Sequence, residues 1–507
     1  MQTLYDPKFT RVGMACQKAE PTDAELHAMI DDAIRQVLGP QGLRALVKPG
    51  DHVVIKTNVV CCWQGARGEK GRGVITDPRI VRYVAEQIRD IIGWDNGSDL
   101  KVVDAVFTQD ANPSGFGNTV SFHWARLNVI PDNAVHPEDV TYDLNGDGIL
   151  DGTSGARLVN VDALGGDERD LHRIRLASGK VVPVAFPRFL RRREEATDGG
   201  DWTDVFIGMP VFKNHGFIGC TGSLKLHYGF RDLRAWFGDT GRRGHSGMYS
   251  DRRDGTISPE GRQKLCDYIT AQHMVRSYDF VLMDCLTANR RGPCGPTGGV
   301  SLTPDPDEAV DYFLTNAILA SRDSVAIDTV ESTLGGYRYE SILLPKTAAE
   351  NGVGVQAPEQ IEVDGMERLR YHRAWMQETY GPTGQFPLSA LGDPEIADTV
   401  LPKYTVTMDR FTTVPDADGY HHVKYTVHPT EPGVDPRIRR VDLTVAGVVR
   451  QSIVGDDILE GEFRFRHSDY DEWGGAYVVG IISVWDDMFN CVNSTTEFFV
   501  PPDGCED

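Results

Sequence analysis

Apolar residues recur every three or four positions in residues 23–38, and Gly39-Pro40 ends the pattern. This spacing predicts an amphipathic helix. Residues 52–58 (HVVIKTN) instead form a short β-branched run that stays apolar until its end. Such a run is typical of a strand that is buried on both faces of a parallel sheet.

A second helical pattern covers residues 78–92, and another apolar run follows at residues 101–107. Pro78 stands just inside the start of this helix, where its missing N–H has no cost. The order strand, helix, strand predicts a βαβ unit with a right-handed crossover.

The same alternation of strand and helix patterns resumes further along the chain and predicts a mostly parallel α/β body over residues 1–400. The later strands are expected at residues 204–209, 279–284 and 317–321, and the later helices at 261–277, 324–334 and 348–351. Between residues 112 and 201 this alternation of strand and helix patterns is absent from the sequence. There we expect an inserted, partly irregular subdomain with a hairpin around Ser178-Gly179 and a solvated charge run at residues 191–195.

From residue 401 to residue 507 the sequence pattern changes to short runs of alternating apolar and polar residues, separated by Asp, Gly and Pro. These runs lie at residues 404–407, 422–427, 440–445, 462–466, 477–485 and 497–500. Their regular spacing predicts a C-terminal all-β sandwich of the immunoglobulin or fibronectin type.

The net charge of the chain limits the kinds of partner that it is expected to bind. The chain has 52 basic and 74 acidic residues, a formal net charge of −22. This charge repels nucleic acid and anionic membranes, so neither is an expected partner. No apolar run reaches membrane-spanning length, and no signal peptide is visible at the start, so we expect no membrane insertion.

The nine cysteines contain no C-x-x-C pair, which argues against a structural zinc or iron–sulfur site. Cys491 and Cys505 are spaced for a disulfide that would close a short C-terminal loop in an oxidising compartment. Cys294 has no neighbouring base in the sequence and is interpreted as an inert loop thiol.

The segment with the most chemical information is residues 209–233 (MPVFKNHGFIGCTGSLKLHYGFRDL), which follows a predicted strand. Its cationic and imidazole side chains stand among four glycines, whose N–H groups can converge on an anion. We expect a cradle for a carboxylate, phosphate or sulfate; a glycine-rich packing turn with solvated lysines is the alternative. The side chains of this candidate site are Lys213, His215, Thr221, Gly222, Lys225, His227 and Arg231.

A second candidate cation lies at the end of the first buried strand, in Lys56-Thr57-Asn58. Ligands of open parallel sheets bind beyond the carboxyl ends of the strands. Lys56 in an apolar strand is costly unless its ammonium reaches a cleft or a partner, although it could also simply extend to solvent at the strand end. We therefore assign Lys56 to the catalytic group with Lys213, His215 and Lys225, and Asn58 to substrate binding.

Further polar residues lie near later strand ends. Asp284 ends one predicted strand, and Arg291 lies in the Gly/Pro loop after it as a candidate substrate-binding residue. Asp323 and Asp328 flank the start of a helix, where Asp323 is a candidate cap. A carboxylate beside lysines in a cleft can serve as a general base or a metal ligand.

Several motifs in order resemble the prokaryotic family known as domain of unknown function 362. They are I-K-T-N (55–58), T-D-P (76–78), G-M-P-V-F-K-N-H (208–215), C-T-G-S-L-K (220–225), R-G-P-C-G-P-T-G-G (291–299) and S-R-D-S-V-A-I-D (321–328). The resemblance spans about residues 12 to 365. The chain departs from the family pattern at Thr57, where members often have proline, and at His227, where they often have asparagine. The resemblance implies no assigned activity.

A weaker similarity extends to the nickel-pincer lactate racemase group. By that analogy His215 and His227 would be transition-metal or hydride-transfer groups, with a nickel-type cofactor, and Lys225 would anchor the cofactor or substrate. This analogy is at the level of the fold.

A separate acidic loop lies at residues 142–151 (YDLNGDGILD). Its alternating oxygen ligands and Gly148 resemble a calcium-binding loop of the EF-hand or dockerin type, with a plain Asp/Gly turn as the alternative. The candidate calcium ligands are Asp143, Asn145, Asp147, Ile149 and Asp151. Weak loops of this type suit extracellular calcium, which favours an exported protein.

Three functions follow as expectations. The first is an enzyme, of isomerase or oxidoreductase type and with or without a metal, that moves a proton or hydride on a small anionic organic molecule. The second is a non-catalytic, calcium-stabilised surface or assembly protein, whose sandwich contacts another protein or a second copy. The third is an iron–sulfur redox protein.

Overall fold

A computed structural model describes residues 9–58, 73, 76–93, 99–104, 156–161, 164, 166–215, 218–230, 258–289, 312–364, 366–380, 402–409, 415–445, 448–456, 458–466 and 476–500. The chain divides into two compact units. We call residues 11–356 and 375–397 the α/β unit, and residues 1–10, 357–374 and 398–507 the β unit. Of the helices in the described residues, none combines the length and apolar character needed to span a lipid bilayer.

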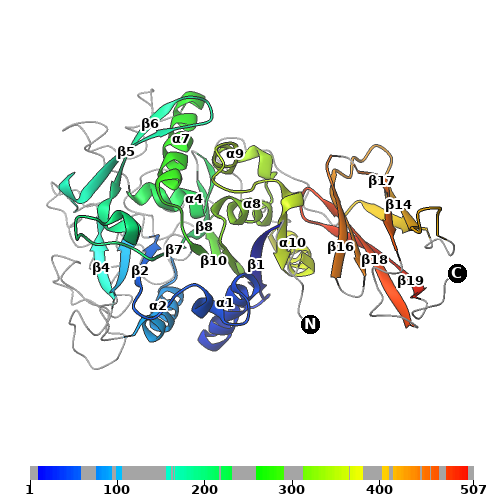
Figure 1. The fold of residues 1–507 in the computed structure, drawn as a ribbon, viewed down its shortest axis with the longest axis horizontal. Helices are drawn as coiled ribbons and strands as arrows, with labels where there is room; N and C mark the ends of the chain where they lie inside the picture. The colour runs from blue at the N-terminus through cyan, green and yellow to red at the C-terminus, as the bar shows by residue number, and fades with distance from the viewer. Residues whose placement is uncertain are drawn as a thin grey trace. The chain divides into compact units, whose positions relative to one another are not determined.

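The α/β unit is built around one mixed sheet with the strand order β1-β11-β10-β7-β2-β3-β4 (Figure 1). Its strands are β1 (Thr10–Cys16), β2 (His52–Thr57), β3 (Asp99–Asp104), β4 (Arg157–Asn160), β7 (Val205–Met209), β10 (Phe280–Asn289) and β11 (Tyr312–Ser321). The neighbours from β4 to β10 run parallel, whereas β11 is antiparallel to both β10 and β1. The predicted mostly parallel sheet is therefore mixed. An apolar run buried on both faces carries no signal of its direction, so the pattern did not reveal that β11 is reversed.

Two short hairpins complete the strands of this unit. β8 (Val211–His215) continues beside β10 and pairs with β9 (Gly219–Thr221). β5 (Arg169–Arg175) and β6 (Val181–Pro187) form a separate antiparallel pair. The hairpin predicted around Ser178-Gly179 is thereby confirmed, because Gly179 has a positive φ of 84° and its N–H donates to the Leu176 carbonyl. The charge run at residues 191–195 is mostly exposed, as predicted.

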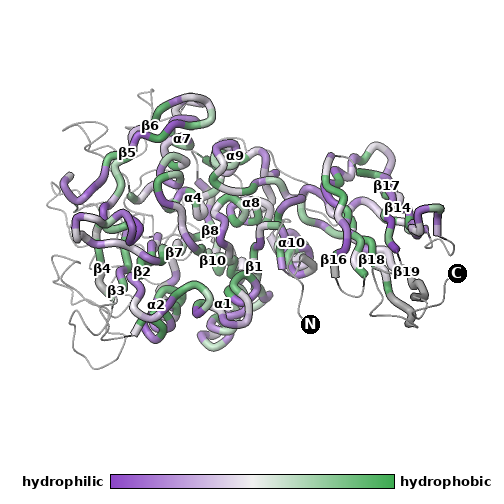
Figure 2. The backbone as a smooth tube through the Cα atoms, viewed as in Figure 1, coloured by the Kyte–Doolittle hydropathy of each residue, from purple (hydrophilic) through white to green (hydrophobic). Residues whose placement is uncertain are grey.

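Helices cover both faces of the mixed sheet. They are α1 (Asp23–Leu38), α2 (Pro78–Ile92), α4 (Ser223–Leu226), α7 (Pro259–Val275), α8 (Ser324–Leu334) and α9 (Leu343–Glu350). The predicted helices at residues 23–38, 78–92 and 324–334 coincide with α1, α2 and α8. In Figure 2 the tube of α2 changes between hydrophobic and hydrophilic colours, as expected of a helix with one face on a sheet.

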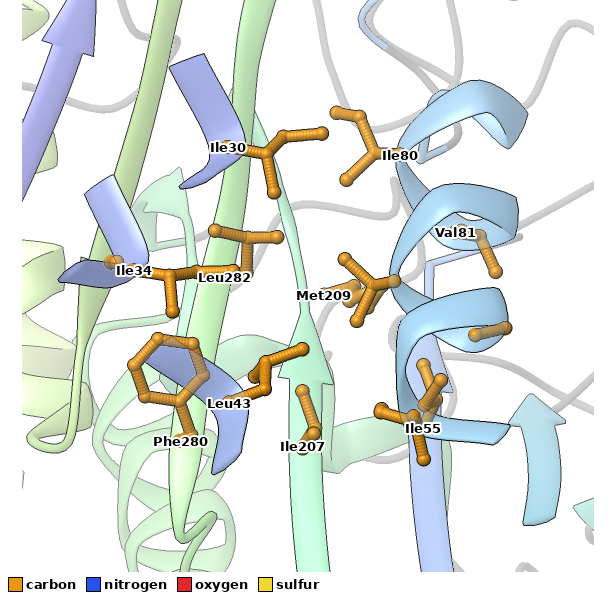
Figure 3. Packing of buried hydrophobic residues seen from close by; sticks show 14 of the residues in the cluster. Ile30, Ile34, Leu43, Ile55, Ile80, Val81, Ile207, Met209, Phe280 and Leu282 are labelled. Atoms are coloured by element: carbon orange, nitrogen blue, oxygen red, sulfur yellow. The ribbon is translucent and has the colours of Figure 1, made fainter. Parts of the chain in front are cut away.

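The packing of α1 and α2 defines one face of the sheet. Ile30 and Ile34 of α1 and Ile80 of α2 lie over the buried strand residues Ile55 and Ile207 (Figure 3). Side chains alternate between the two faces of a strand, so Lys56, next to Ile55, projects to the opposite face. On that face lie α4, α7, α8 and α9, which pack against one another.

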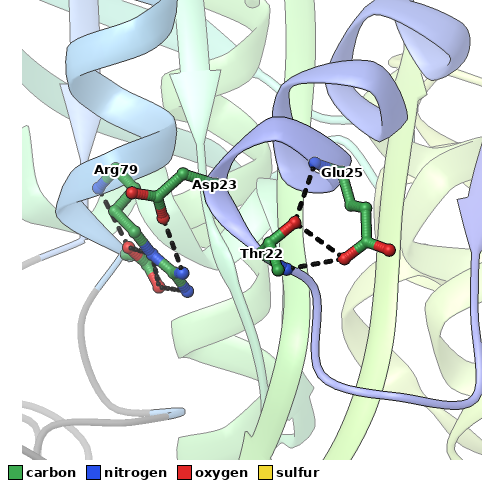
Figure 4. Close-up of polar contacts among 5 residues, drawn as sticks. Thr22, Asp23, Glu25 and Arg79 are labelled. Carbon is green, nitrogen blue, oxygen red and sulfur yellow. Dashed lines mark hydrogen bonds and ion pairs between the residues drawn. The ribbon is translucent and has the colours of Figure 1, made fainter.

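Local contacts explain where α1 begins. The Thr22 hydroxyl accepts from the Glu25 N–H, and the Glu25 carboxylate accepts from the Thr22 N–H at 2.8 Å, which forms a capping box (Figure 4). Asp23 pairs with Arg79 of α2 at 3.1 Å. These contacts fix the start of α1 next to the start of α2.

The β unit contains a three-stranded sheet, β13-β14-β17, and a four-stranded sheet, β16-β15-β18-β19, both antiparallel. Their bounds are β13 (Tyr404–Met408), β14 (His421–Pro429), β15 (Ile438–Val445), β16 (Val448–Val454), β17 (Glu460–Phe465), β18 (Ala476–Asp486) and β19 (Cys491–Val500). The two sheets share one hydrophobic cluster, to which Tyr425, Val441 and Ile482 contribute. Separate antiparallel sheets are thus found where an all-β module was predicted, and the immunoglobulin or fibronectin type stays a prediction.

A segment before residue 375 also belongs to the β unit. It holds β12 (Ile361–Asp364) and the first part of α10 (Met366–Tyr380). Arg373 is 1 % exposed and donates to the Met488 carbonyl at 2.5 Å, and Arg370 donates to the Cys491 carbonyl at 2.6 Å. Neither this segment nor β16 is among the predicted elements.

Candidate functional site

Lys56 is buried at the end of β2, on the face away from α1 and α2. Its ammonium forms an ion pair with Asp104, at the end of β3, and donates to the Thr57 carbonyl at 2.6 Å. The same ammonium lies 5.5 Å from the centre of the Phe230 ring. A Cβ built on Gly229 would lie 3.0 Å from the Lys56 Cε and Nζ atoms. The glycine at position 229 therefore lets the later turn approach the lysine of the first strand.

Lys213 and His215 lie two positions apart on β8, so their side chains project to the same face of that strand. Each is 1 % exposed. Thr221 of β9 is the cross-strand partner of Lys213, and its hydroxyl donates to the Lys213 carbonyl at 3.3 Å. The β8–β9 hairpin thus gathers three of the predicted site residues.

Lys225 joins this group from the short helix α4. Its ammonium lies 4.4 Å from the centre of the Tyr228 ring, and the side chain is partly exposed. Burial lowers the pKa of His215 well below its ordinary value, and the charges of Lys225 and Lys213 lower it further. His215 is therefore a neutral imidazole at pH 7, with two lysines close enough to influence it.

Gly222 immediately precedes α4 and lies against two carboxyl groups of α8. A Cβ at this position would lie 2.2 Å from a Glu331 oxygen and 2.3 Å from an Asp328 oxygen. Asp328 accepts from the Ser223 N–H at 2.6 Å and from the Leu224 N–H at 2.9 Å. Only glycine leaves room for both carboxyls at this position, and the role of Gly222 in substrate binding stays a prediction.

His227 lies in a buried cluster of rings with His273, Phe230 and Tyr278. The two imidazoles stack with their centres 3.6 Å apart, and burial lowers the pKa of both. His227 Nε2 lies 2.7 Å from the Arg276 carbonyl, which can only accept. The proton of the neutral ring is therefore on Nε2, and the lone pair is on Nδ1.

Tyr278 lies near both the end of β2, which carries Lys56, and the turn that holds Gly222 and His227. Its ring lies against Gly208 of β7 and packs on His227 at 4.3 Å between ring centres. Burial raises the pKa of Tyr278 well above its ordinary value, and the charges of Asp104 and Asp328 add to this effect. The partner of Lys56 and the carboxyl beside Gly222 are thus both near one tyrosine.

Thr76 and Asp77 form hydrogen bonds on the face of the sheet that lies opposite to Lys56. The Thr76 hydroxyl donates to the Met209 carbonyl at 2.7 Å and accepts from the Asn58 N–H at 2.9 Å. The Asp77 N–H donates to Asp284 at 2.8 Å. Burial, and then Asp77, raise the pKa of Asp284 to about 7. Asp284 lies two positions from both Leu282 and Leu286, so it shares their face of the sheet, which is the face that α1 and α2 cover. Lys56 lies on the other face.

Several predicted site residues lie outside the described residues. They are Arg231, Arg291, Cys294, Cys505 and the acidic loop with Asp143, Asn145, Asp147, Ile149 and Asp151. The calcium loop and the Cys491–Cys505 disulfide therefore stay predictions. Within the described part of the chain, no three His, Cys, Asp or Glu side chains are arranged to hold a metal ion.

Sequence reasoning assigned no role in this site to Glu331, Tyr278 or His273. The signal for Glu331 was present, since it is a carboxylate in a stretch otherwise made of apolar and small residues (SVAIDTVESTL). All eleven residues of that helix are buried, and an acid in a fully buried helix needs an explanation. Tyr278 and His273 carried no comparable signal, because aromatic residues in apolar stretches are ordinary core residues.

Part of the chain is similar to a known protein family. No curated protein matches the chain. A family model described as Domain of unknown function (DUF362) matches residues 167–333, the part from β5 to α8 that carries the motifs at 208–215, 220–225, 291–299 and 321–328. The motifs at 55–58 and 76–78 lie before this match, and the similarity to nickel-pincer racemases stays a prediction. The predicted family resemblance is confirmed: residues 167–333 of this chain match the domain of unknown function 362.

Proposed function

We propose that the chain is an enzyme that binds a small organic anion beside β8 and α4 and moves a proton or hydride at a carbon bearing oxygen. The observation that carries the proposal is the pair of lysines, Lys213 and Lys225, whose charges act on one buried neutral imidazole, His215. Two ammonium groups supply the attraction for a carboxylate in a molecule that is negative as a whole.

His215 is the group to which we assign the proton transfer. A neutral imidazole can accept a proton from a carbon that a neighbouring carboxylate or carbonyl makes acidic. The lysines hold the anion in place and stabilise negative charge that develops next to that carbon. An isomerase or an oxidoreductase acting on a hydroxy or oxo acid fits this division of roles.

A transition metal or nickel-type cofactor at His215 and His227 is an extension of the same proposal. Since His227 Nε2 faces the Arg276 carbonyl, Nδ1 is the atom of this ring that would bind a metal. Metal analysis of the purified protein tests the extension: stoichiometric nickel, iron or zinc supports it, and calcium alone favours the rival surface or assembly protein.

The first test is calorimetry with a panel of small 2-hydroxy and 2-oxo carboxylates. Lys225→Ala should weaken binding roughly tenfold to a hundredfold, the equivalent of losing a charge-assisted contact of about 1.5–3 kcal/mol. Its melting temperature should change little, because the side chain is partly exposed. Lys346→Ala removes an exposed lysine of α9 and serves as the matched control.

The second test follows the hydrogen on the carbon next to the carboxylate. In D₂O the bound acid should exchange this hydrogen for deuterium, as read by proton NMR. His215→Gln should stop the exchange and leave binding in place. If no acid of the panel binds to the wild-type protein, or if Lys225→Ala loses stability and keeps its affinity, the proposal is wrong.

A further inference from the structure

The outer face of the four-stranded sheet in the β unit holds a hollow of about 400 Å³. On β15, Val441 and Leu443 belong to the hydrophobic cluster that the two sheets share, so Asp442 and Thr444 project to the other side. The same alternation on β18 places Trp485 on that outer side. Every residue that lines the hollow belongs to the β unit. The volume lies within the range of about 300–1,000 Å³ that pockets for small organic ligands have.

The segment that precedes residue 375 forms the opposite wall of the hollow. The turn Pro358–Gln360 packs against β15, and β12 follows it directly. The charged side chains of this segment that line the hollow are Glu359, Glu362, Asp364 and Arg368. One wall therefore carries groups of both charge signs.

Asp442 holds the floor of the hollow in one arrangement. It is 2 % exposed, and its carboxylate accepts from Arg440 Nε at 2.8 Å and from the Ser452 hydroxyl at 2.6 Å. The same carboxylate accepts from Trp485 Nε1 at 3.0 Å. The Arg440 guanidinium in turn lies 3.8 Å from the centre of the Phe9 ring. These contacts fix the orientation of the indole, which is half-buried and offers an apolar ring to a ligand.

The mixed charges of the wall favour a neutral ligand over an ion. An anion would face the carboxylates of Glu359 and Asp364, and a cation would face the guanidinium of Arg368. A hydroxyl group suits both, because it can donate to a carboxylate and accept from a guanidinium. Each of these groups has several hydrogen-bonding positions, so it can bind a hydroxyl in addition to a partner within the protein.

We propose that the hollow binds a mono- or disaccharide. The apolar C–H face of a sugar ring lies on the indole of Trp485, and its hydroxyl groups bond to the carboxylates and the guanidinium of the wall. This site is separate from the anion site beside β8 and α4, because its lining belongs to the β unit alone.

Calorimetry on the full chain with glucose, galactose, mannose, maltose, cellobiose and lactose tests the proposal. At least one of these saccharides should bind. Asp364→Asn should weaken that binding roughly tenfold, since a hydrogen bond to a charged acceptor becomes one to a neutral amide. Asp418→Asn alters an exposed acid in the turn before β14 and, as the matched control, should bind like the wild type.

Two further variants complete the test. Trp485→Leu should abolish binding, and its melting curve reports whether the β unit is folded. Lys225→Ala should leave the saccharide affinity unchanged, because that lysine belongs to the α/β unit.

Saccharide binding that either Asp364→Asn or a folded Trp485→Leu weakens supports the site. If Trp485→Leu does not fold, Asp364→Asn decides alone, because asparagine keeps the shape of this half-buried side chain. The proposal is overturned if no saccharide binds, if neither variant lowers the affinity, or if Lys225→Ala abolishes the binding. Binding of choline or sulfate in the hollow in place of every saccharide would also overturn it, because the ligand would then be an ion.

Discussion

Lys56 was predicted to reach a ligand from the end of the first buried strand. The side chain instead lies 1 % exposed against Asp104, Thr57 and the Phe230 ring. A buried ion pair brings little net stability, because the cost of removing both charges from water offsets their attraction. Removing one partner is much more costly, since the other charge is then buried alone.

We therefore expect Lys56→Met to lower the free energy of unfolding of the α/β unit by about 3–5 kcal/mol. Urea denaturation measures this effect. The control is Arg82→Ala, which breaks an exposed pair with Glu86 and should cost about 0.3–0.5 kcal/mol. Adding Asp104→Leu to Lys56→Met should recover part of the loss. A Lys56→Met protein as stable as the wild type would show that the pair has no such role.

At the scale of the element, the capping box of α1 is the clearest case in which local sequence determines structure. Thr22 and Glu25 satisfy each other's backbone N–H groups at the start of the helix. All the partners lie within four residues, so the motif depends on no distant part of the chain.

Thr22→Ala should lower the free energy of unfolding by about 1 kcal/mol, because the hydroxyl that accepts the Glu25 N–H is lost. Thr22→Ser keeps the hydroxyl and should stay close to the wild type. Chemical denaturation of the three proteins side by side measures the difference. Equal stabilities for the alanine and serine variants would contradict a capping role.

At the scale of the whole molecule, buried titratable groups make stability depend on pH in a way that the net charge of −22 does not show. In the folded α/β unit the pKa of Asp284 is about 7 and that of Asp328 is about 8, because both are buried. In the unfolded chain such carboxyls titrate near 4. The folded state therefore holds protons that the unfolded state has lost, and this stability disappears as the pH rises through 7 and 8.

The buried histidines act in the opposite direction. Burial lowers the pKa of His273 to about 3, and the pKa values of His215 and His227 are also well below the ordinary value. Their contribution is present above about pH 6.5 and is lost as the pH falls below it. Between pH 4 and pH 6.5 a rise in pH therefore lowers stability through the carboxyls and raises it through the histidines. Above pH 6.5 only the loss of stability through the carboxyls continues.

We expect the stability of the α/β unit to fall between pH 6.5 and pH 8.5, with a slope on the order of 1.4 kcal/mol per pH unit for each titrating carboxyl. Urea unfolding at a series of pH values gives the slope. Asp284→Asn removes one of these carboxyls and should make the slope shallower between pH 6.5 and pH 7. A stability that rises over this range would contradict the assignment.

Much of the secondary structure was predictable because its signals are local. The periodicities at residues 23–38, 78–92 and 324–334 reproduced three helices with their bounds, and the alternating runs after residue 401 marked six of the strands in the β unit. β16, β12 and α10 were not predicted. The exposed β16 residues Val449 and Val454 interrupt a simple alternation, and α10 has polar residues on most of its surface.

What the sequence alone determined is the composition of the candidate site: lysines, histidines and glycines in residues 209–233, and a lysine at the end of the first buried strand. The tertiary structure decided which of these groups meet. Pairing of β2 with β3 placed Asp104 beside Lys56, and packing of α8 against α4 placed Asp328 and Glu331 at Gly222. Sequence cannot supply these contacts, because the charge of a buried group depends on neighbours that lie about 50 to 110 positions away along the chain.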